Sequence, residues 1–236
     1  MNNITLGRCF SEGLTAFKNY LWLAIGAYLL YTVISAVGGN IPFVNFLYAI
    51  LVAFPLVGGF MMLFLNIVKG ANSEIGQLFN GFSDWVRWMG VGWLLVLYML
   101  VAMLIGAVPF LIFLAIAAAV GIDSGPGIFL MVVGGIASVV AIAAIAVRWM
   151  FVYYIAADEG ATATEAIKKS AEMTEGMRPQ LFWIAFVLAL FAWVGVIALG
   201  VGVIVTSAIS QCAMAALYLD VKQARAPAVP ATPPSP

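Results

Sequence analysis

The chain has 236 residues, of which 65% are hydrophobic and only 8% are charged. An ordinary soluble domain has about 45–50% apolar and about 25% charged residues, so this composition excludes a water-soluble fold. Ten Lys and Arg residues balance ten Asp and Glu residues, and the chain contains no His. It therefore offers no basic field for nucleic acid and lacks the commonest proton shuttle of enzymes. The composition predicts an all-α membrane protein with several spans.

The lengths of the charge-free runs predict the individual spans, because a helix needs about 20 apolar residues to cross a membrane. Four runs predict spans near residues 20–37, 41–68, 88–120 and 127–147, the last continuing as a helix to 157. The final run, residues 181–219, would form a helix about 58 Å long, so it must fold back. Gly200 and Gly202 are placed to turn the chain between spans near 181–199 and 203–219. The sequence thus predicts six transmembrane helices in three hairpins.

The basic residues predict the orientation of these spans, because Lys and Arg accumulate in cytoplasmic loops. With six spans, all ten basic residues fall on one side and the opposite side carries only Asp123. Both termini are therefore expected in the cytoplasm. This topology places Cys9 in the cytoplasm and Cys212 inside a membrane helix, which excludes a disulfide framework.

A short amphipathic segment, which we call an elbow, precedes each odd-numbered span. Apolar residues recur at helical spacing in all three elbows, at Leu6, Phe10, Leu14 and Phe17, at Ile75, Leu78, Phe79 and Phe82, and at Ala163, Ile167, Ala171 and Thr174. We expect the apolar faces to dock on the bilayer, and the third elbow, poorest in large side chains, to pack on protein. Thr162 and Glu165 predict a capping box there, and Glu165 and Lys169 are spaced for an ion pair. The pattern indicates either an internal duplication or aromatic anchors beside each span.

The segment from residue 148 to residue 176 contains the most distinctive residues outside the spans. A candidate cytoplasmic interaction face comprises Arg148, Asp158, Glu159, Lys168, Lys169, Ser170 and Gly176. Arg148 follows the start of its helix at Gly127 by about 31 Å, which places it at the cytoplasmic boundary. It is either a snorkelling anchor or a site for a lipid phosphate or an acidic partner.

Small and polar residues gather in the last predicted span, at Gly202, Thr206, Ser207, Ser210 and Gln211. Their spacing favours close helix packing. The alternative is a hydrophilic path for a small neutral solute, helped by kinks expected at Pro55 and Pro109. No ionisable residue lies near the middle of a predicted span, which argues against a proton-coupled pump. No zinc spacing, catalytic triad or facing carboxylate pair occurs, so no catalytic residue, cofactor or metal is predicted.

The segment from residue 148 to residue 176 resembles the signature of a large bacterial family of six-helix membrane proteins of unknown function. This family is similar to the YciC-like proteins and to the membrane domain fused to some glycerophosphodiester phosphodiesterases. The shared pattern is Arg148 with aromatic residues, then Asp158-Glu159, a helix with Lys168-Lys169-Ser170, and Gly176 before the next span. Resembling residues also occur at Pro55, Gly58, Gly59, Gly70, Leu78, Phe79 and Phe82. The resemblance covers about residues 5–221 and implies a bacterial inner membrane, six helices and no established activity.

Residues 1–225 are predicted to form one membrane domain, followed by a disordered Pro-rich tail at 226–236. We expect a non-catalytic integral inner-membrane protein that organises or assists membrane partners or lipids through its cytoplasmic face. The alternatives are a transporter or facilitator of a neutral or lipophilic solute and, from the family kinship alone, a membrane-embedded lipid enzyme. The expected partners are membrane lipids and a membrane or cytoplasmic protein, with neither nucleic acid nor metal.

Overall fold

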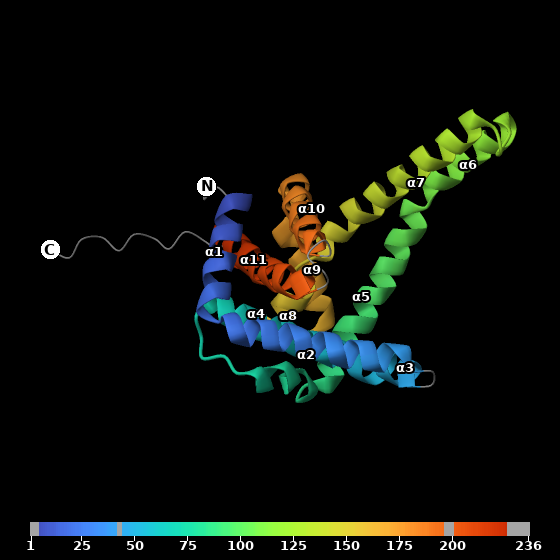
Figure 1. Ribbon diagram of the computed structural model, residues 1–236. Helices are drawn as coiled ribbons and strands as arrows, with labels where there is room; N and C mark the ends of the chain where they lie inside the picture. Colours follow the sequence, from blue (N-terminus) through green and yellow to red (C-terminus); the bar gives the residue numbers. More distant parts are fainter. Residues whose placement is uncertain (1–4, 42–43, 196–200, 226–236) are drawn as a thin grey trace.

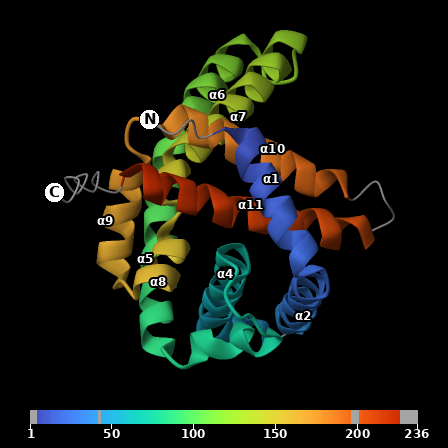
Figure 2. The ribbon, with the colours of Figure 1, turned by 90° about the vertical axis from the view of Figure 1, so that its left-hand side faces the viewer.

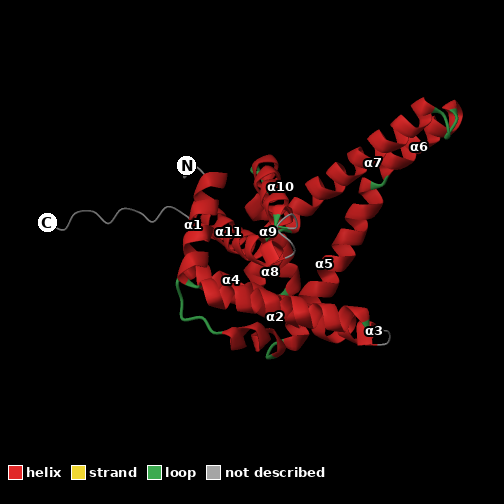
Figure 3. Ribbon diagram, in the orientation of Figure 1, coloured by secondary structure: helices red, strands yellow, loops and turns green. Residues whose placement is uncertain are grey.

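A computed structural model describes residues 5–41, 44–195 and 201–225, and over these ranges Figure 3 shows helices joined by loops. Five helical segments are long and apolar enough to cross a membrane, or six if the bent pair α9 (Ala163–Thr174) and α10 (Arg178–Val194) forms one span. The predicted all-α, multi-pass class is confirmed at this level. The predicted tail at 226–236 and the first half of the predicted turn, Leu199 and Gly200, lie outside the described residues. The second glycine of that turn, Gly202, belongs to a helix that begins at Val201.

Each elbow occurs directly before a long apolar helix. The chain begins with α1 (Leu6–Asn19), α2 (Leu21–Asn40), α3 (Val44–Leu47), the π-helical turn η1 (Tyr48–Val52) and α4 (Ala53–Lys69). It continues with the 3₁₀ helix η2 (Ile75–Phe82), α5 (Trp85–Gly106), α6 (Val108–Val120), α7 (Gly125–Ala146), the 3₁₀ turn η3 (Val147–Trp149) and α8 (Val152–Glu159). It ends with α9, α10 and α11 (Val201–Arg225). The predicted helix to residue 157 is thus interrupted at η3.

Two prolines mark breaks in the long helices, because proline lacks the N–H of the helical hydrogen bond. At Pro109 the expected kink is present, since α5 ends at Gly106 and α6 begins beside the proline. Pro55 cannot bond the carbonyl of Leu51, four residues earlier, which lies in the π-helical turn η1. The indole Nε1–H of Trp85 donates to this carbonyl at 2.7 Å. The start of α5 therefore satisfies the group that Pro55 leaves without a partner.

The helix pairs do not all run in one direction. In Figure 1, α5, α6 and α7 form an arm that projects from the rest of the molecule. In Figure 2, α2 is seen nearly end-on, whereas α10 and α11 run across the view. The arm exposes large apolar side chains, among them Leu104, Phe129 and Val139. Contiguous apolar surface of this kind suits contact with lipid.

The core lies where α4, α5, α8 and α11 meet. Trp88, Phe151 and Tyr218 are fully buried there. The ring of Trp88 stacks on Tyr153 with centroids 6.1 Å apart. A Cβ at Gly58 would lie 2.3 Å from the Trp88 ring, so the glycine makes room for the indole. The core thus joins the membrane helices to α8.

The first elbow, α1, packs on protein. Cys9, Gly13 and Phe17 are buried on the face that α1 turns to α11. A Cβ at Gly13 would lie 2.5 Å from the backbone nitrogen of Ala213, so the two helices approach backbone to backbone. Of the predicted apolar face, Phe17 is buried, whereas Leu6, Phe10 and Leu14 are only partly buried against the core. The face expected to dock on the bilayer is therefore covered by protein in part.

The second elbow, η2, has one face on protein and one exposed apolar face. A Cβ at Gly59 would lie 1.9 Å from the carbonyl oxygen of Leu78, and one at Gly81 would lie 1.8 Å from that of Pro55. These two glycines let η2 lie directly on the backbone of α4. On the outer side Phe79 is 47% exposed. An exposed apolar face is thus present in η2 alongside a close protein contact, and its docking on the bilayer stays a prediction.

The third elbow, α9, begins with the predicted capping box. The backbone N–H of Thr162 donates to Glu165 Oε2 at 3.0 Å, and this bond lowers the pKa of Glu165. The predicted ion pair between Glu165 and Lys169 is absent. Lys169 instead lies 2.6 Å from Glu159, while the Glu165 carboxylate serves the cap. As predicted, α9 packs on protein, with Ile167 buried.

Candidate functional site

Asp158 is a buried carboxylate at the point where α4, α8 and α11 meet. It pairs with Lys69, at the end of α4, and with Lys222, in the last turn of α11. Tyr218 also donates its hydroxyl to Asp158 Oδ2 at 2.9 Å. The Asp158 side chain is only 6% exposed. A buried charge requires such partners, because burying it alone costs several kcal/mol.

Glu159 extends this arrangement to α9. Its carboxylate lies 2.9 Å from Lys222 and 2.6 Å from Lys169. We call the group the ion cluster, comprising Lys69, Asp158, Glu159, Lys169, Lys222 and Tyr218. The structure thus brings together three predicted face residues: Glu159 pairs with Lys169, and both Glu159 and Asp158 pair with Lys222. Lys69 and Lys222 lie outside the predicted face, although each follows the end of a predicted span and is in the last turn of its helix, a position that favours cations.

A second buried carboxylate, Asp220, ties α1 to the end of α11. Arg8 lies 3.2 Å from Asp220 and 2.8 Å from Glu12. The thiol of Cys9 donates to Asp220 Oδ2 at 3.6 Å. A cavity of about 600 Å³ lies beside this group, lined in part by Arg8, Glu12, Asp220 and Lys69. Both cations of this cavity already have carboxylate partners.

Cys9 is predicted to be unreactive in the folded protein. Burial, with the neighbouring Asp220 carboxylate, raises the pKa of the Cys9 thiol to about 12. Because the thiolate is the nucleophile, we expect N-ethylmaleimide at pH 8 to label folded Cys9 at least about 100-fold more slowly than unfolded Cys9. A Cys212→Ala background isolates the Cys9 signal. Equal labelling rates before and after unfolding in SDS would contradict the buried position.

Ser170 and Gly176 serve the local structure. Ser170 is buried on α9, accepts the N–H of Phe151 at 3.3 Å and donates to the carbonyl of Arg148 at 3.0 Å. These backbone groups lie where the helix is interrupted between η3 and α8, so they need outside partners. Gly176 has φ of 76° and follows the end of α9. Ser170 therefore fixes α9 against the segment that follows the C-terminal end of α7.

Arg148 and Lys168 line a separate cavity of about 440 Å³ at the foot of the arm. We call it the Arg148 cavity; its other lining residues are Leu94, Tyr98, Trp149, Thr164, Ile167 and Ala171. The rings of Tyr98 and Trp149 meet edge to face with centroids 5.1 Å apart. Among the residues that the structure describes, no carboxylate pairs with Arg148 or Lys168. The cavity therefore holds two cations that nothing in the described chain neutralises.

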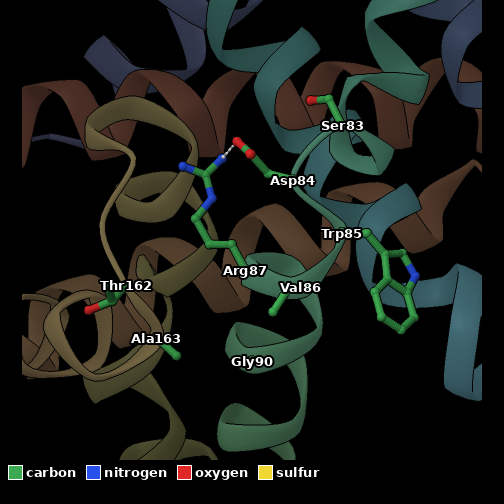
Figure 4. A pocket seen from close by; sticks show the side chains of 8 residues that line it. All are labelled: Ser83, Asp84, Trp85, Val86, Arg87, Gly90, Thr162 and Ala163. Carbon is green, nitrogen blue, oxygen red and sulfur yellow. Dashed lines mark ion pairs between the residues drawn. The ribbon is translucent and has the colours of Figure 1, made fainter.

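A third cavity, of about 600 Å³, lies between the start of α5 and the start of α9 (Figure 4). Arg87 reaches toward Asp84 in Figure 4 and lies 3.1 Å from its carboxylate. The Arg87 guanidinium also stands 5.2 Å from the ring centre of Trp88. Thr162 and Ala163, at the start of α9, line the facing wall. The cation of this cavity is already paired, which distinguishes it from the Arg148 cavity.

The hydroxyl groups of α11 bond to the backbone of α10. Thr206 donates to the carbonyl of Ala192 at 3.0 Å, and Ser210 donates to that of Leu188 at 3.1 Å. Both bonds cross between the two helices. Such bonds are typical of close helix packing in membranes, where a free hydroxyl is costly.

The other small and polar residues predicted in the last span, Gly202, Ser207 and Gln211, also lie in or beside contacts between helices. A Cβ at Gly195 would lie 2.6 Å from the carbonyl carbon of Gly202, so α10 and α11 approach closely there. Ser207 is buried. Gln211 Oε1 accepts the hydroxyl of Tyr154 at 3.5 Å, which links α11 to α8. The small and polar residues of the last predicted span thus take part in several separate contacts between helices in the described structure.

The long apolar helices and the charges gathered at their ends define a multi-pass, all-α membrane protein. The chain belongs to the family described as protein of unknown function DUF975, which matches it over residues 14–225. Comparison with curated proteins and with solved structures gave no match. Among the described residues, no three His, Cys, Asp or Glu side chains are grouped to hold a metal ion. The family match includes both the ion cluster and the Arg148 cavity.

Proposed function

We propose that this chain is a non-catalytic integral protein of a bacterial inner membrane that organises or assists membrane partners or lipids. In this proposal both termini are cytoplasmic, and the six spans form three hairpins. The concentration of all ten basic residues in one set of predicted loops supports the orientation. The ion cluster also supports the orientation, since its ion pairs gather the ends of α4, α8 and α11, together with α9, in one place.

The division of α9 into two faces is the observation that carries the proposal. One face is buried and comprises Ala166, Ile167, Ser170, Met173 and Thr174. The other is exposed and comprises Thr164, Glu165, Lys168, Lys169 and Glu172. Ser170 and the ion cluster hold this helix in place. A fixed, exposed, charged helix beside a membrane is suited to binding a partner, because its backbone is already ordered and only side chains lose freedom on binding.

The carboxylates nearest to this face support the fixed position of α9, on which the proposed binding role depends. Asp158 and Glu159 are each paired with two lysines, an arrangement that stabilises helix contacts. The resemblance to the YciC-like proteins and to the phosphodiesterase-linked membrane domain also favours a role beside lipid. The phosphodiesterase activity belongs to a domain that this resemblance does not include, so we do not extend it to this chain.

Photo-crosslinking from α9 in native membranes tests the proposal. A benzoylphenylalanine residue at Lys168 or Glu172, both exposed, should give a discrete protein or lipid product. Ile122, exposed in the turn before α7, is the control on the predicted opposite side. Products no stronger from α9 than from Ile122 would overturn the proposed face. Reporter fusions at Asn40 and Ser124 test the orientation, which a cytoplasmic signal at either position contradicts.

A further inference from the structure

We propose that the Arg148 cavity binds the phosphate of an anionic phospholipid whose acyl chains lie along the exposed apolar surface of α5 and α7. This inference deepens the proposed function and rests on it, since it names lipid as a partner of the same face. Its ligand is recognised by charge at one end and by apolar contact at the other.

Two cations from different elements converge on the cavity. Arg148 belongs to η3, at the foot of α7, and Lys168 belongs to α9. Their backbones are held together, because Ser170 of α9 donates to the carbonyl of Arg148 at 3.0 Å. Thr164 adds a hydroxyl to the lining. Guanidinium, ammonium and hydroxyl groups are the usual donors to phosphate oxygens, and a fixed backbone lowers the entropy cost of binding.

The charge of this cavity is uncompensated, unlike that of its neighbours. The cations of the other two cavities pair with carboxylates, as described for Arg8, Lys69 and Arg87. On α9 itself, the Glu165 carboxylate is bonded to Thr162 in the capping box. Glu172, one turn beyond Lys168, forms no ion pair within the described chain. Two cations lining one cavity attract an anion from outside, because it relieves their mutual repulsion.

Apolar surface continues from the cavity along both helices of the arm. On α5, Val101 and Ile105 follow Leu94 and Tyr98 at helical spacing and are exposed. On α7, Val140 lies two turns before Arg148 and is also exposed. The cavity of about 440 Å³ suits a glycerophosphate head group. Acyl chains would then cover α5 and α7, and this second contact favours a lipid over a free phosphate.

The aromatic residues of the lining fit the same ligand. Trp149 is nearly buried, and its ring packs against Tyr98, which is partly exposed. Trp and Tyr are enriched at the head-group level of membranes, where one end of the side chain is apolar and the other meets water. Tyr98 and Trp149 therefore form a wall between the charged end of the cavity and the lipid surface.

Native mass spectrometry of the full chain in detergent, titrated with phosphatidylglycerol or phosphatidylcholine, tests the proposal. We expect preferential binding of phosphatidylglycerol, and about tenfold weaker binding in Arg148→Gln and in Lys168→Gln, since each removes a charge-assisted bond. Lys18→Gln is the matched control, because Lys18 is an exposed cation of α1 that forms no ion pair among the described residues. It should change the affinity less than about twofold.

Two results would overturn the assignment. Unchanged phosphatidylglycerol binding in the double variant Arg148→Gln/Lys168→Gln would exclude the cavity as the site. Inorganic phosphate or glycerol 3-phosphate binding as tightly as the lipid would make it a site for soluble phosphate. A protein crosslinked from Glu172 would persist in either case, so failure of this inference is distinguishable from failure of the proposed function.

Discussion

Asp158→Ala is expected to lower the free energy of unfolding by about 3 kcal/mol, the lower end of the range for breaking a buried ion pair. The substitution leaves Lys69 and Lys222 without their shared carboxylate and Tyr218 without its acceptor. The lower end applies because both lysine side chains are more than a third exposed, so water compensates part of the loss. Unfolding by SDS in mixed micelles, followed by circular dichroism, measures the change.

Asp123→Ala is the control for this prediction. Asp123 is exposed in the turn before α7 and forms no ion pair in the described part of the chain. Its removal should change the free energy of unfolding by less than about 0.5 kcal/mol. Equal effects of the two substitutions would show that the ion cluster does not hold α4, α8 and α11 together.

Gly81→Ala is expected to cost about 3 kcal/mol, the upper end of the usual range for overpacking. The new Cβ would lie 1.8 Å from the carbonyl oxygen of Pro55, and a backbone atom cannot move aside as a flexible side chain can. We expect η2 to separate from α4, which would also remove the bond from Trp85 to the carbonyl of Leu51. The same SDS titration measures the loss.

Gly76→Ala in the same 3₁₀ helix is a close control. Nothing lies within 4 Å of a Cβ at Gly76, so the added methyl group meets open space. We expect a change of less than about 0.5 kcal/mol, as for other exposed surface positions. A Gly81→Ala protein as stable as Gly76→Ala would contradict the close contact between η2 and α4.

The helices follow from local properties of the chain. Long charge-free runs predict the long apolar helices, because the number of apolar residues that a span requires is set by the bilayer. The capping box at Thr162 and the break at Pro109 depend on hydrogen bonds between residues at most four apart. Local composition also predicts the positions of the three elbows, since each is an amphipathic stretch beside a span.

The contacts of the elbows depend on residues far away in the chain. Gly13 meets Ala213 across most of the sequence, and no periodicity in α1 distinguishes a face that meets protein from one that meets lipid. Lys169 likewise stands four residues after Glu165 but pairs with Glu159, because the capping box already uses the nearer carboxylate. A spacing rule identifies which residues are neighbours on one helix, but it does not show which of several possible partners each side chain binds.

The sequence by itself therefore determined the class of protein, its apolar helices and the region in which its few charges gather. Only the tertiary structure decided which charges neutralise one another. Asp158 meets Lys69 and Lys222 because the folded helices bring their ends together, whereas Arg148 and Lys168 are left facing one cavity without a carboxylate. The physical reason is that ion pairing depends on distances in space, and these arise from packing between helices far apart in the chain.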